Sequence, residues 1–233
     1  MTSPVCVITG VGPGNGASFS RRFSDAGYRV AMLARSSDRL RELEAAIPNS
    51  KGYAVDVADT ESVAEGFARI RAELGPAAVL VHNAGSGMFG DFLATTGEML
   101  EHAWRVNTLG LFLCAQAVVP DMIKAADGAI IVTGATASLR GGANFAGFAS
   151  AKAAQRSLAQ SMARSLWPRG IHVALVIVDG VIDIPNTRAM FGDRPDDFFL
   201  RPDAIASTVL QLVQQDRSAW TFELDVRPNK EKW

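Results

Sequence analysis

Four glycines stand at alternate positions near the start of the chain, at residues 10, 12, 14 and 16. They follow a short apolar run at residues 5–8, which is typical of a buried parallel strand, and they precede a helical pattern at residues 17–26. Glycines at such a turn let the backbone approach a pyrophosphate, and the N-terminus of the next helix supplies N–H donors. The pattern predicts a dinucleotide site, with a purely structural turn as the alternative.

The second apolar strand, expected at residues 29–34, ends in a basic segment. Sites that select NAD carry an acidic residue near the end of this strand, where it binds the ribose hydroxyls. Arg35 comes here instead, with Ser36, Ser37 and Arg39 close behind. A guanidinium group and hydroxyls suit a 2′-phosphate, so NADP(H) is favoured over NAD(H). The alternative is that Arg35 is an ordinary solvated residue that opens a helix.

Apolar strands alternate with helical patterns along the whole chain. The expected strands are residues 5–8, 29–34, 52–57, 78–81, 129–133, 171–178 and 222–226, and the expected helices are residues 17–26, 37–47, 61–74, 98–122, 148–167 and 201–215. This alternation predicts an α/β protein: a three-layer, Rossmann-like, doubly wound fold with a seven-stranded, mainly parallel sheet, in a single domain over residues 1–233. Ligands are then expected at the carboxyl ends of the strands.

Residues 184–200 read as a loop-rich insertion after the carboxyl end of a strand, which makes them a candidate substrate lid. Asn107 lies inside the long helix expected at residues 98–122, where asparagine is a poor helix former. A local polar or packing role is therefore plausible for it. The chain has only two tyrosines, Tyr28 and Tyr53. Both are expected at the starts of strands, away from the ligand edge of the sheet.

The composition argues against nucleic acid and membranes as partners. The net charge is −1, which gives no broad attraction for nucleic acid or anionic lipid. We expect no apolar run of the roughly 18 residues that span a bilayer, and the N-terminus lacks the basic segment of a signal peptide. These features favour a cytoplasmic protein with a small-molecule substrate and with Cys6 and Cys114 as reduced core thiols. The histidines are scattered, so no metal site is expected.

Several short motifs occur in the order and at the separations that are typical of one enzyme family. Residues 9–16 read Thr-Gly-Val-Gly-Pro-Gly-Asn-Gly, residues 56–57 read Asp-Val, residues 82–85 read His-Asn-Ala-Gly, and Lys152 lies near the start of a long helix. Over nearly its whole length the chain resembles the short-chain dehydrogenase/reductase family. The resemblance implies that Asp56 and Val57 contact adenine, that Lys152 binds the nicotinamide ribose, and that Asn107 holds a water of a proton relay. Asn15 stands where an isoleucine is usual.

The resemblance, together with the basic segment after the second strand, implies a set of cofactor-binding residues. They are Gly10, Pro13, Gly14, Asn15, Gly16, Arg35, Asp56, Val57, Asn83, Ala84, Gly85, Lys152, Val181 and Ile182. It also implies that the helices at residues 98–122 and 148–167 pair across a homodimer or homotetramer interface. From periodicity alone, these faces could equally be packed within one subunit.

The two central catalytic positions of the family do not match. The tyrosine that lies four residues before the lysine is Phe148 here, and the serine about thirteen residues before that tyrosine is Ala135. A shift of one residue would bring in Thr136, whose hydroxyl could partly replace the serine. The family's Pro-Gly after the sixth strand appears as Asp179-Gly180, and its nicotinamide-contacting threonine appears as Ile184.

Phenylalanine has no ionisable proton, and losing a general acid costs about 10²–10⁴ in rate, or roughly 3–5 kcal/mol of barrier. The least strained residual relay combines Lys152, Thr136 and a water, so the expected catalytic residues are Lys152, Asn107 and Thr136. Ordinary loop hydrogen bonding is the alternative for Thr136. Two functions stay open: an NADP(H)-dependent oxidoreductase of a small carbonyl or alcohol with an atypical site, and a non-catalytic NADP(H)-binding sensor or oligomer partner.

Overall fold

The computed structural model describes residues 3–231. Its centre is a seven-stranded sheet in the order β3-β2-β1-β4-β5-β6-β9, and all neighbouring strands in it run parallel. The strands are β1 (Val5–Thr9), β2 (Arg29–Ala34), β3 (Ser50–Ala54), β4 (Ala77–His82), β5 (Gly128–Ala135), β6 (Ile171–Val178) and β9 (Glu223–Val226). The expected seven-stranded, doubly wound α/β fold is confirmed.

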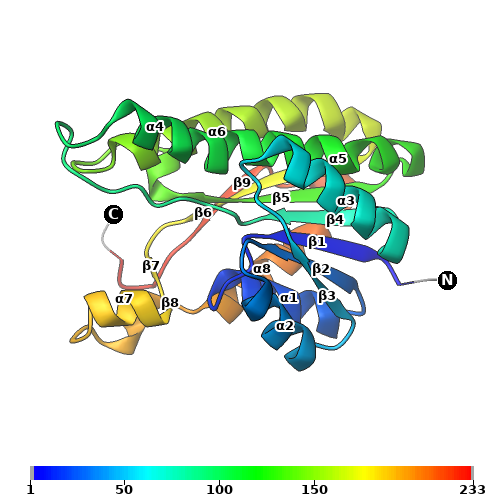
Figure 1. The fold of residues 1–233 in the computed structure, drawn as a ribbon, viewed down its shortest axis with the longest axis horizontal. Helices are drawn as coiled ribbons and strands as arrows, with labels where there is room; N and C mark the ends of the chain where they lie inside the picture. The colour runs from blue at the N-terminus through cyan, green and yellow to red at the C-terminus, as the bar shows by residue number, and fades with distance from the viewer. Residues whose placement is uncertain (1–2, 232–233) are drawn as a thin grey trace.

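Helices cover both faces of the sheet and complete three layers (Figure 1). One face carries α3 (Thr60–Leu74), α4 (Gly97–Trp104), α5 (Gly110–Ala125) and α6 (Ala146–Leu166), and the other carries α1 (Asn15–Asp25), α2 (Ser37–Ala46) and α8 (Pro202–Val213). Each helical layer buries its own apolar cluster against the sheet. The strand order reverses between β1 and β4, so the carboxyl ends of these strands form the crevice where such folds bind ligands.

Side-chain caps explain where two of the site-forming helices begin. Ser36 precedes α2, and its hydroxyl accepts a hydrogen bond from the Arg39 backbone N–H at 3.5 Å. Asp59 precedes α3, and its carboxylate accepts from the backbone N–H groups of Glu61 and Ser62 at 2.8 and 3.1 Å. Asp59 is therefore the N-cap of α3. Such caps satisfy N–H groups that the helix itself leaves unpaired.

The long helix around Asn107 differs from the expected one. Helical structure continues over residues 97–125, and a π-helical turn, Arg105–Leu109, joins α4 to α5. Contrary to the expectation from the sequence, this stretch is long and apolar enough to cross a membrane, with a mean hydropathy of 1.5. However, Leu111, Cys114 and Val118 are buried in the core cluster beside the sheet. The stretch is a core helix, and its hydropathy reflects that packing.

Residues 184–200, expected as a loop-rich insertion, are partly regular. They contain the short helix α7 (Pro185–Met190), a 3₁₀ turn (Asp196–Phe198) and the strand β8 (Phe199–Leu200), which pairs in parallel with β7 (Val181–Ile182). A proline at the first helical position favours the start of α7. The segment lies beyond the carboxyl edge of the main sheet, next to the C-terminal chain (Figure 1).

The edge strand β3 begins and ends earlier than expected, and this corrects the placement of Tyr53. Tyr53 is the fourth of five residues in β3, opposite Leu33 of β2. Its ring is buried and its hydroxyl donates a hydrogen bond to Glu73 at 2.8 Å, near the end of α3. Burial, followed by the bond to Glu73, raises the pKa of the Tyr53 hydroxyl. The hydroxyl of Tyr53 is therefore engaged within the fold, between the edge strand and α3.

Candidate nucleotide-binding and catalytic site

A cavity of about 410 Å³ lies at the carboxyl ends of β1, β2 and β4, beside the chain that follows β3. Six of the expected cofactor-binding residues line it: Gly10, Arg35, Asp56, Val57, Ala84 and Gly85. Ser36, one of the hydroxyl residues expected beside Arg35, also lines it, whereas Ser86, His102 and Val106 line it and were not expected at the site. His102 and Val106 come from α4 and the π-helical turn, about 50 residues beyond Asp56 in the chain. No local motif marks them as lining residues.

The glycine turn is held against the loop that follows β4. A Cβ atom on Gly10, whose φ is +68°, would lie only 2.5 Å from the Ala84 Cα. The Asn83 side chain donates to the Gly10 carbonyl oxygen at 3.0 Å. The Thr9 hydroxyl oxygen is 3.2 Å from the backbone nitrogens of both Asn83 and Ala84 and accepts from them. Only glycine allows this close approach, which brings the two loops together at one end of the cavity.

Helix α1 begins directly after this turn, at Asn15, without a side-chain cap and without an acidic residue in its first turn. Its first N–H groups and its dipole therefore favour an anion. Asn15 is 6% exposed, and its Oδ1 atom has no hydrogen-bond partner among the described residues. The glycine turn and the helix start fit a phosphate group of a nucleotide. The unpartnered Oδ1 atom of Asn15 fits a donor group of the same ligand.

Arg35 and Arg39 form the basic end of the cavity, at the start of α2. Within residues 3–231, neither guanidinium group forms a salt bridge, whereas Arg41, two residues after Arg39 on α2, pairs with Asp38. The hydrogen bond from the Arg39 backbone N–H to Ser36 fixes the start of α2. Arg35 and Arg39, on either side of Ser36, therefore both line the cavity. The remaining expected cofactor-binding residues lie outside this lining: Pro13, Gly14, Asn15, Gly16, Asn83, Lys152, Val181 and Ile182.

Lys152 lies beside the cavity, at the second turn of α6. Its ammonium group donates to the Thr133 carbonyl oxygen at 2.8 Å and to the Gln155 Oε1 atom at 3.0 Å. A Cβ atom on Gly85, which lines the cavity, would be 3.8 Å from the ammonium nitrogen. Both hydrogen-bond acceptors are neutral, and burial lowers the pKa of Lys152 from 10.5 to about 7. This lysine can therefore both give and take a proton near neutral pH.

Asn107 lies in the π-helical turn and is fully buried. Its side-chain amide donates to the carbonyl oxygens of Ala103 at 2.8 Å and Ser86 at 3.2 Å. Its Oδ1 atom has no partner among the described residues and lies 3.2 Å from where a Gly85 Cβ would be. The asparagine thus fixes the loop after β4 against the helix. π-helical turns inside α-helices frequently mark functional sites.

Phe148 packs into a cluster of three rings. Its ring centroid lies 5.3 Å from that of Phe89 and 6.3 Å from that of Phe145. The Lys152 nitrogen lies 6.0 Å from the centre of the Phe148 ring. The ring therefore reaches the neighbourhood of the lysine but presents only carbon atoms to it.

Thr136 begins the turn after β5, and its hydroxyl hydrogen-bonds to the Asp179 carboxylate at the end of β6. Asp179 in turn pairs with Arg227 at 3.2 Å. Among the described residues, Thr136 makes no hydrogen bond to Lys152. The structure therefore brings Lys152 and Asn107 together near Gly85, while the hydroxyl of Thr136 is bound to the Asp179 carboxylate.

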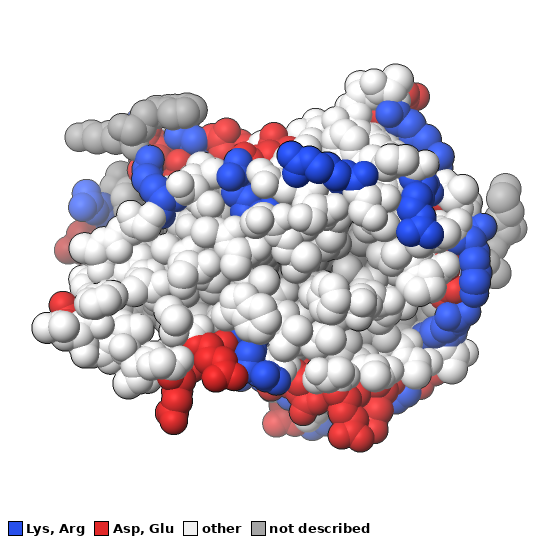
Figure 2. Space-filling view, turned by 90° about the horizontal axis from the view of Figure 1, so that it is seen from above, with Lys and Arg blue, Asp and Glu red and all other residues white. Residues whose placement is uncertain are grey.

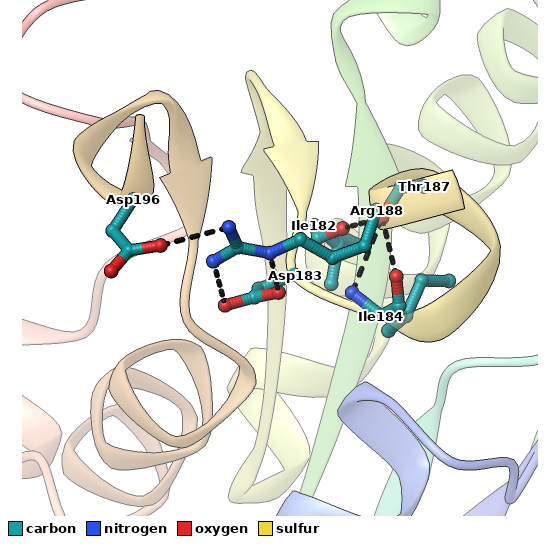
Figure 3. A network of polar contacts seen from close by, with 6 residues as sticks. All are labelled: Ile182, Asp183, Ile184, Thr187, Arg188 and Asp196. Atoms are coloured by element: carbon teal, nitrogen blue, oxygen red, sulfur yellow. Dashed lines mark hydrogen bonds and ion pairs between the residues drawn. The ribbon is translucent and has the colours of Figure 1, made fainter. Parts of the chain in front are cut away.

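The segment of α7 is fastened by one arginine (Figure 3). Arg188 donates two hydrogen bonds to Asp183 at 2.6 and 2.8 Å and one to Asp196 at 2.8 Å, and its guanidinium lies 4.0 Å from the centre of the Phe199 ring. Ile184 faces the glycine turn, because a Cβ atom on Gly14 would lie 2.5 Å from its Cγ2 atom. Ile184, at the start of this segment, therefore packs against the turn that precedes α1.

We expect Arg188→Gln to loosen this segment while leaving the rest of the fold intact. Partly exposed ion pairs contribute about 1 kcal/mol at most, and losing that much local stability multiplies the opened population about fivefold. Native-state cleavage by chymotrypsin after the phenylalanines of residues 184–200 should speed up by a similar factor. Arg201→Gln, at the exposed start of α8, is the matched control. Equal cleavage rates in the two variants would show that Arg188 does not fasten the segment.

Because the pKa of Lys152 is lowered in the folded chain, the free energy of unfolding should depend on pH. Between about pH 7 and its ordinary pKa of 10.5, Lys152 is neutral in the folded chain but protonated in the unfolded chain. The unfolded chain then holds more protons, so the free energy of unfolding rises with pH in this window, by about 1.4 kcal/mol per pH unit. Lys152→Met should remove this rise, and Lys124→Met on the exposed side of α5 should retain it. The measurement is urea unfolding at several pH values in this window. If the free energy of unfolding changes with pH in the same way in wild type and in Lys152→Met, the lowered pKa of Lys152 is contradicted.

The model of the short chain dehydrogenase family matches residues 4–193. The chain belongs to the short-chain dehydrogenase family. It is 29% identical to 3-oxoacyl-[acyl-carrier-protein] reductase FabG of Escherichia coli (strain K12) over 82% of this chain and 78% of that enzyme. Its fold is similar to a short-chain dehydrogenase from Rhodopseudomonas palustris, with 33% identity, a TM-score of 0.82 and coverage of 97% and 98% of the two chains. It is also similar to a metagenomic short-chain oxidoreductase in complex with NADP, with 29% identity, a TM-score of 0.84 and 97% coverage of both chains.

Membership of the short-chain dehydrogenase family places the chain among oxidoreductases that share this fold and a nicotinamide cofactor. Phe148 and Ala135 stand at the positions expected for the tyrosine and serine of this family. The cavity at the carboxyl ends of the strands and the glycine turn fit the nucleotide part of such a cofactor.

Proposed function

We propose that the protein is an NADP(H)-dependent oxidoreductase that reduces a small carbonyl compound, or oxidises the matching alcohol, through a site in which Lys152 handles the proton. The observation that carries this proposal is the buried ammonium group of Lys152, held by two neutral acceptors beside Gly85 at the edge of the cavity. A charged group buried without a counter-ion is costly. A lysine kept at that cost beside a ligand cavity is a candidate for function.

The phosphate preference follows from the basic end of the cavity. Arg35 and Arg39 line it together with Ser36, and no carboxylate from the end of β2 competes for the ribose hydroxyls. A guanidinium group pairs well with a phosphate dianion, and such charge-assisted contacts are the stronger class of hydrogen bonds. NADP(H) is therefore the proposed cofactor, bound with its 2′-phosphate at Arg35.

The residues divide the chemistry as follows. A bound nicotinamide cofactor supplies the hydride. The one N–H of the Lys152 ammonium that Thr133 and Gln155 leave free would face the bound cofactor and substrate. It gives its proton to the alkoxide oxygen of the product, and the neutral amine then takes up a proton from solvent. Asn107 holds the loop that carries Gly85, and Phe148 contributes an apolar wall beside the ammonium. Thr136, bound to Asp179, orients the turn after β5 and leaves the proton transfer to Lys152.

The competing proposal is a non-catalytic NADP(H)-binding protein that acts as a sensor or oligomer partner. It is favoured by the absence of a hydroxyl at both Phe148 and Ala135. A panel of carbonyl substrates with NADPH separates the two. Turnover that is lost in Lys152→Met supports the oxidoreductase, whereas tight NADPH binding without turnover of any member of the panel favours the sensor.

A homodimer or homotetramer is part of the proposal. Figure 2 looks onto the face formed by α4, α5 and α6, whose middle is uncharged while Lys, Arg, Asp and Glu gather along its edges. Leu100, Trp104 and Phe112 are exposed on α4 and α5. Exposed apolar surface with a charged rim is typical of a protein–protein interface. Sedimentation that shows a monomer at micromolar concentration would count against this part.

A further inference from the structure

Gln155 links the helix of Lys152 to the π-helical turn of Asn107. It is fully buried, three residues after Lys152 on α6. Its Nε2 atom donates to the Asn107 carbonyl oxygen at 2.7 Å, and its Oε1 atom accepts from the Lys152 ammonium at 3.0 Å. Both ends of the amide are therefore occupied, and its orientation is fixed by one donor and one acceptor.

This bridge restricts where the ammonium can point. Two of its three hydrogens are bound, one to Gln155 and one to the Thr133 carbonyl oxygen at 2.8 Å. The ammonium nitrogen also lies 3.8 Å from the place of a Gly85 Cβ, and Gly85 lines the cavity. One donor is thus left for a ligand, and a lysine that otherwise has four flexible bonds is held in a single direction.

The side chain that bridges Lys152 and Asn107 is a neutral amide, which affects the charge of Lys152. A glutamate at residue 155 would neutralise the ammonium and hold its proton, whereas the amide of Gln155 leaves the charge uncompensated. The titratable neighbour on the sheet side is His82 at the end of β4, whose pKa is lowered to about 3, first by burial and then by the charge of Lys152. His82 is therefore neutral and gives Lys152 no counter-charge. An amide also exchanges protons far less readily than a water molecule in the same place.

We propose that Gln155 is a positioning residue, which aims the Lys152 ammonium at the cofactor cavity and itself occupies the Asn107 carbonyl and one ammonium hydrogen, so that Lys152 exchanges its proton on the cavity side alone. The role of Lys152 toward the cofactor rests on the proposed function. The bridge itself is a property of the chain without any ligand.

The first test follows the titration of Lys152 by NMR in protein carrying ¹³Cε-labelled lysine. The chain has five lysines, and Lys152→Met assigns the resonance of interest. Wild type should titrate with a midpoint of about 7. Gln155→Glu should raise that midpoint by about 1–3 pH units, because an adjacent carboxylate favours the ammonium. Gln160→Glu, on the same helix, is the matched control. Identical midpoints in all three proteins would overturn the proposal.

The second test measures NADPH binding and does not depend on whether Gln155→Glu folds. Gln155→Met keeps the length of the side chain but removes both hydrogen bonds. We expect it to weaken NADPH binding about tenfold in the wild-type background and to have no further effect in a Lys152→Met background, since coupled residues are not additive. Equal losses in both backgrounds would overturn the proposal. If wild type binds no NADPH, the proposed function fails, and the NMR titration alone decides the role of Gln155.

Discussion

Carbonyl reduction by NADPH should become about 10²–10⁴-fold faster in the double variant Phe148→Tyr with Ala135→Ser, because that is the usual contribution of a positioned general acid. The Phe148 ring already lies with its centre 6.0 Å from the Lys152 nitrogen. A tyrosine hydroxyl there would be subject to the positive charge of Lys152, which lowers the pKa of a phenol and readies it to give a proton. A serine at residue 135 adds a donor for the developing oxyanion.

The rate should be measured by single-turnover oxidation of NADPH with a panel of carbonyl compounds. Phe145→Tyr with Ala135→Ser is the matched control, since Phe145 belongs to the same ring cluster and its centroid lies 6.3 Å from that of Phe148. The control should behave like wild type. If the double variant is no faster than this control, the loss of the tyrosine is not what limits the chemistry at this site.

Arg35→Ala should weaken NADPH binding by about 10- to 150-fold, because a hydrogen bond to a charged group contributes about 1.5–3 kcal/mol. NADH lacks the 2′-phosphate, so its affinity should stay the same. Arg35→Asp should go further and reverse the preference, since a carboxylate repels the phosphate but accepts hydrogen bonds from the ribose hydroxyls of NADH. Isothermal titration of wild type and both variants with each cofactor gives the six affinities.

Arg41→Ala is the control for the Arg35 variants. Arg41 also lies on α2 but pairs with Asp38 and does not line the cavity. Raising the salt concentration should reduce the NADPH preference of wild type and leave that of Arg35→Ala unchanged, because the contact is between exposed charges. Equal affinities of wild type for NADPH and NADH would remove the basis for assigning Arg35 to the 2′-phosphate.

Local patterns were enough to predict the sheet, the glycine turn and the position of Arg35. In each case the signal lies within about ten residues, as in the apolar run of β1 followed by alternate glycines. The early start of β3 was missed because Ser50 and Lys51 lie on an edge strand, where polar residues are common. The helix α7 was missed although Pro185 marks its first position.

Contacts between distant segments could not be predicted. Thr136 and Asp179 are separated by 43 residues and meet only because β5 and β6 are neighbours in the sheet. Gln155 carried one signal, a polar side chain three residues from Lys152 on the same helix, which is the spacing at which side chains touch. The hydrogen bond from Gln155 to the Asn107 carbonyl depends on the π-helical turn, and no sequence pattern predicted that turn.

The most direct test of the account is hydride transfer by wild type under single-turnover conditions. The protein, in excess over [4-²H]NADPH, is mixed with a panel of small ketones and aldehydes, and the products are examined by mass spectrometry for deuterium. The account predicts that at least one carbonyl compound gains one deuterium on its carbonyl carbon, and that Lys152→Met abolishes this transfer. Tight binding of NADPH with no deuterium in any product would contradict the oxidoreductase and leave a nucleotide-binding protein without chemistry.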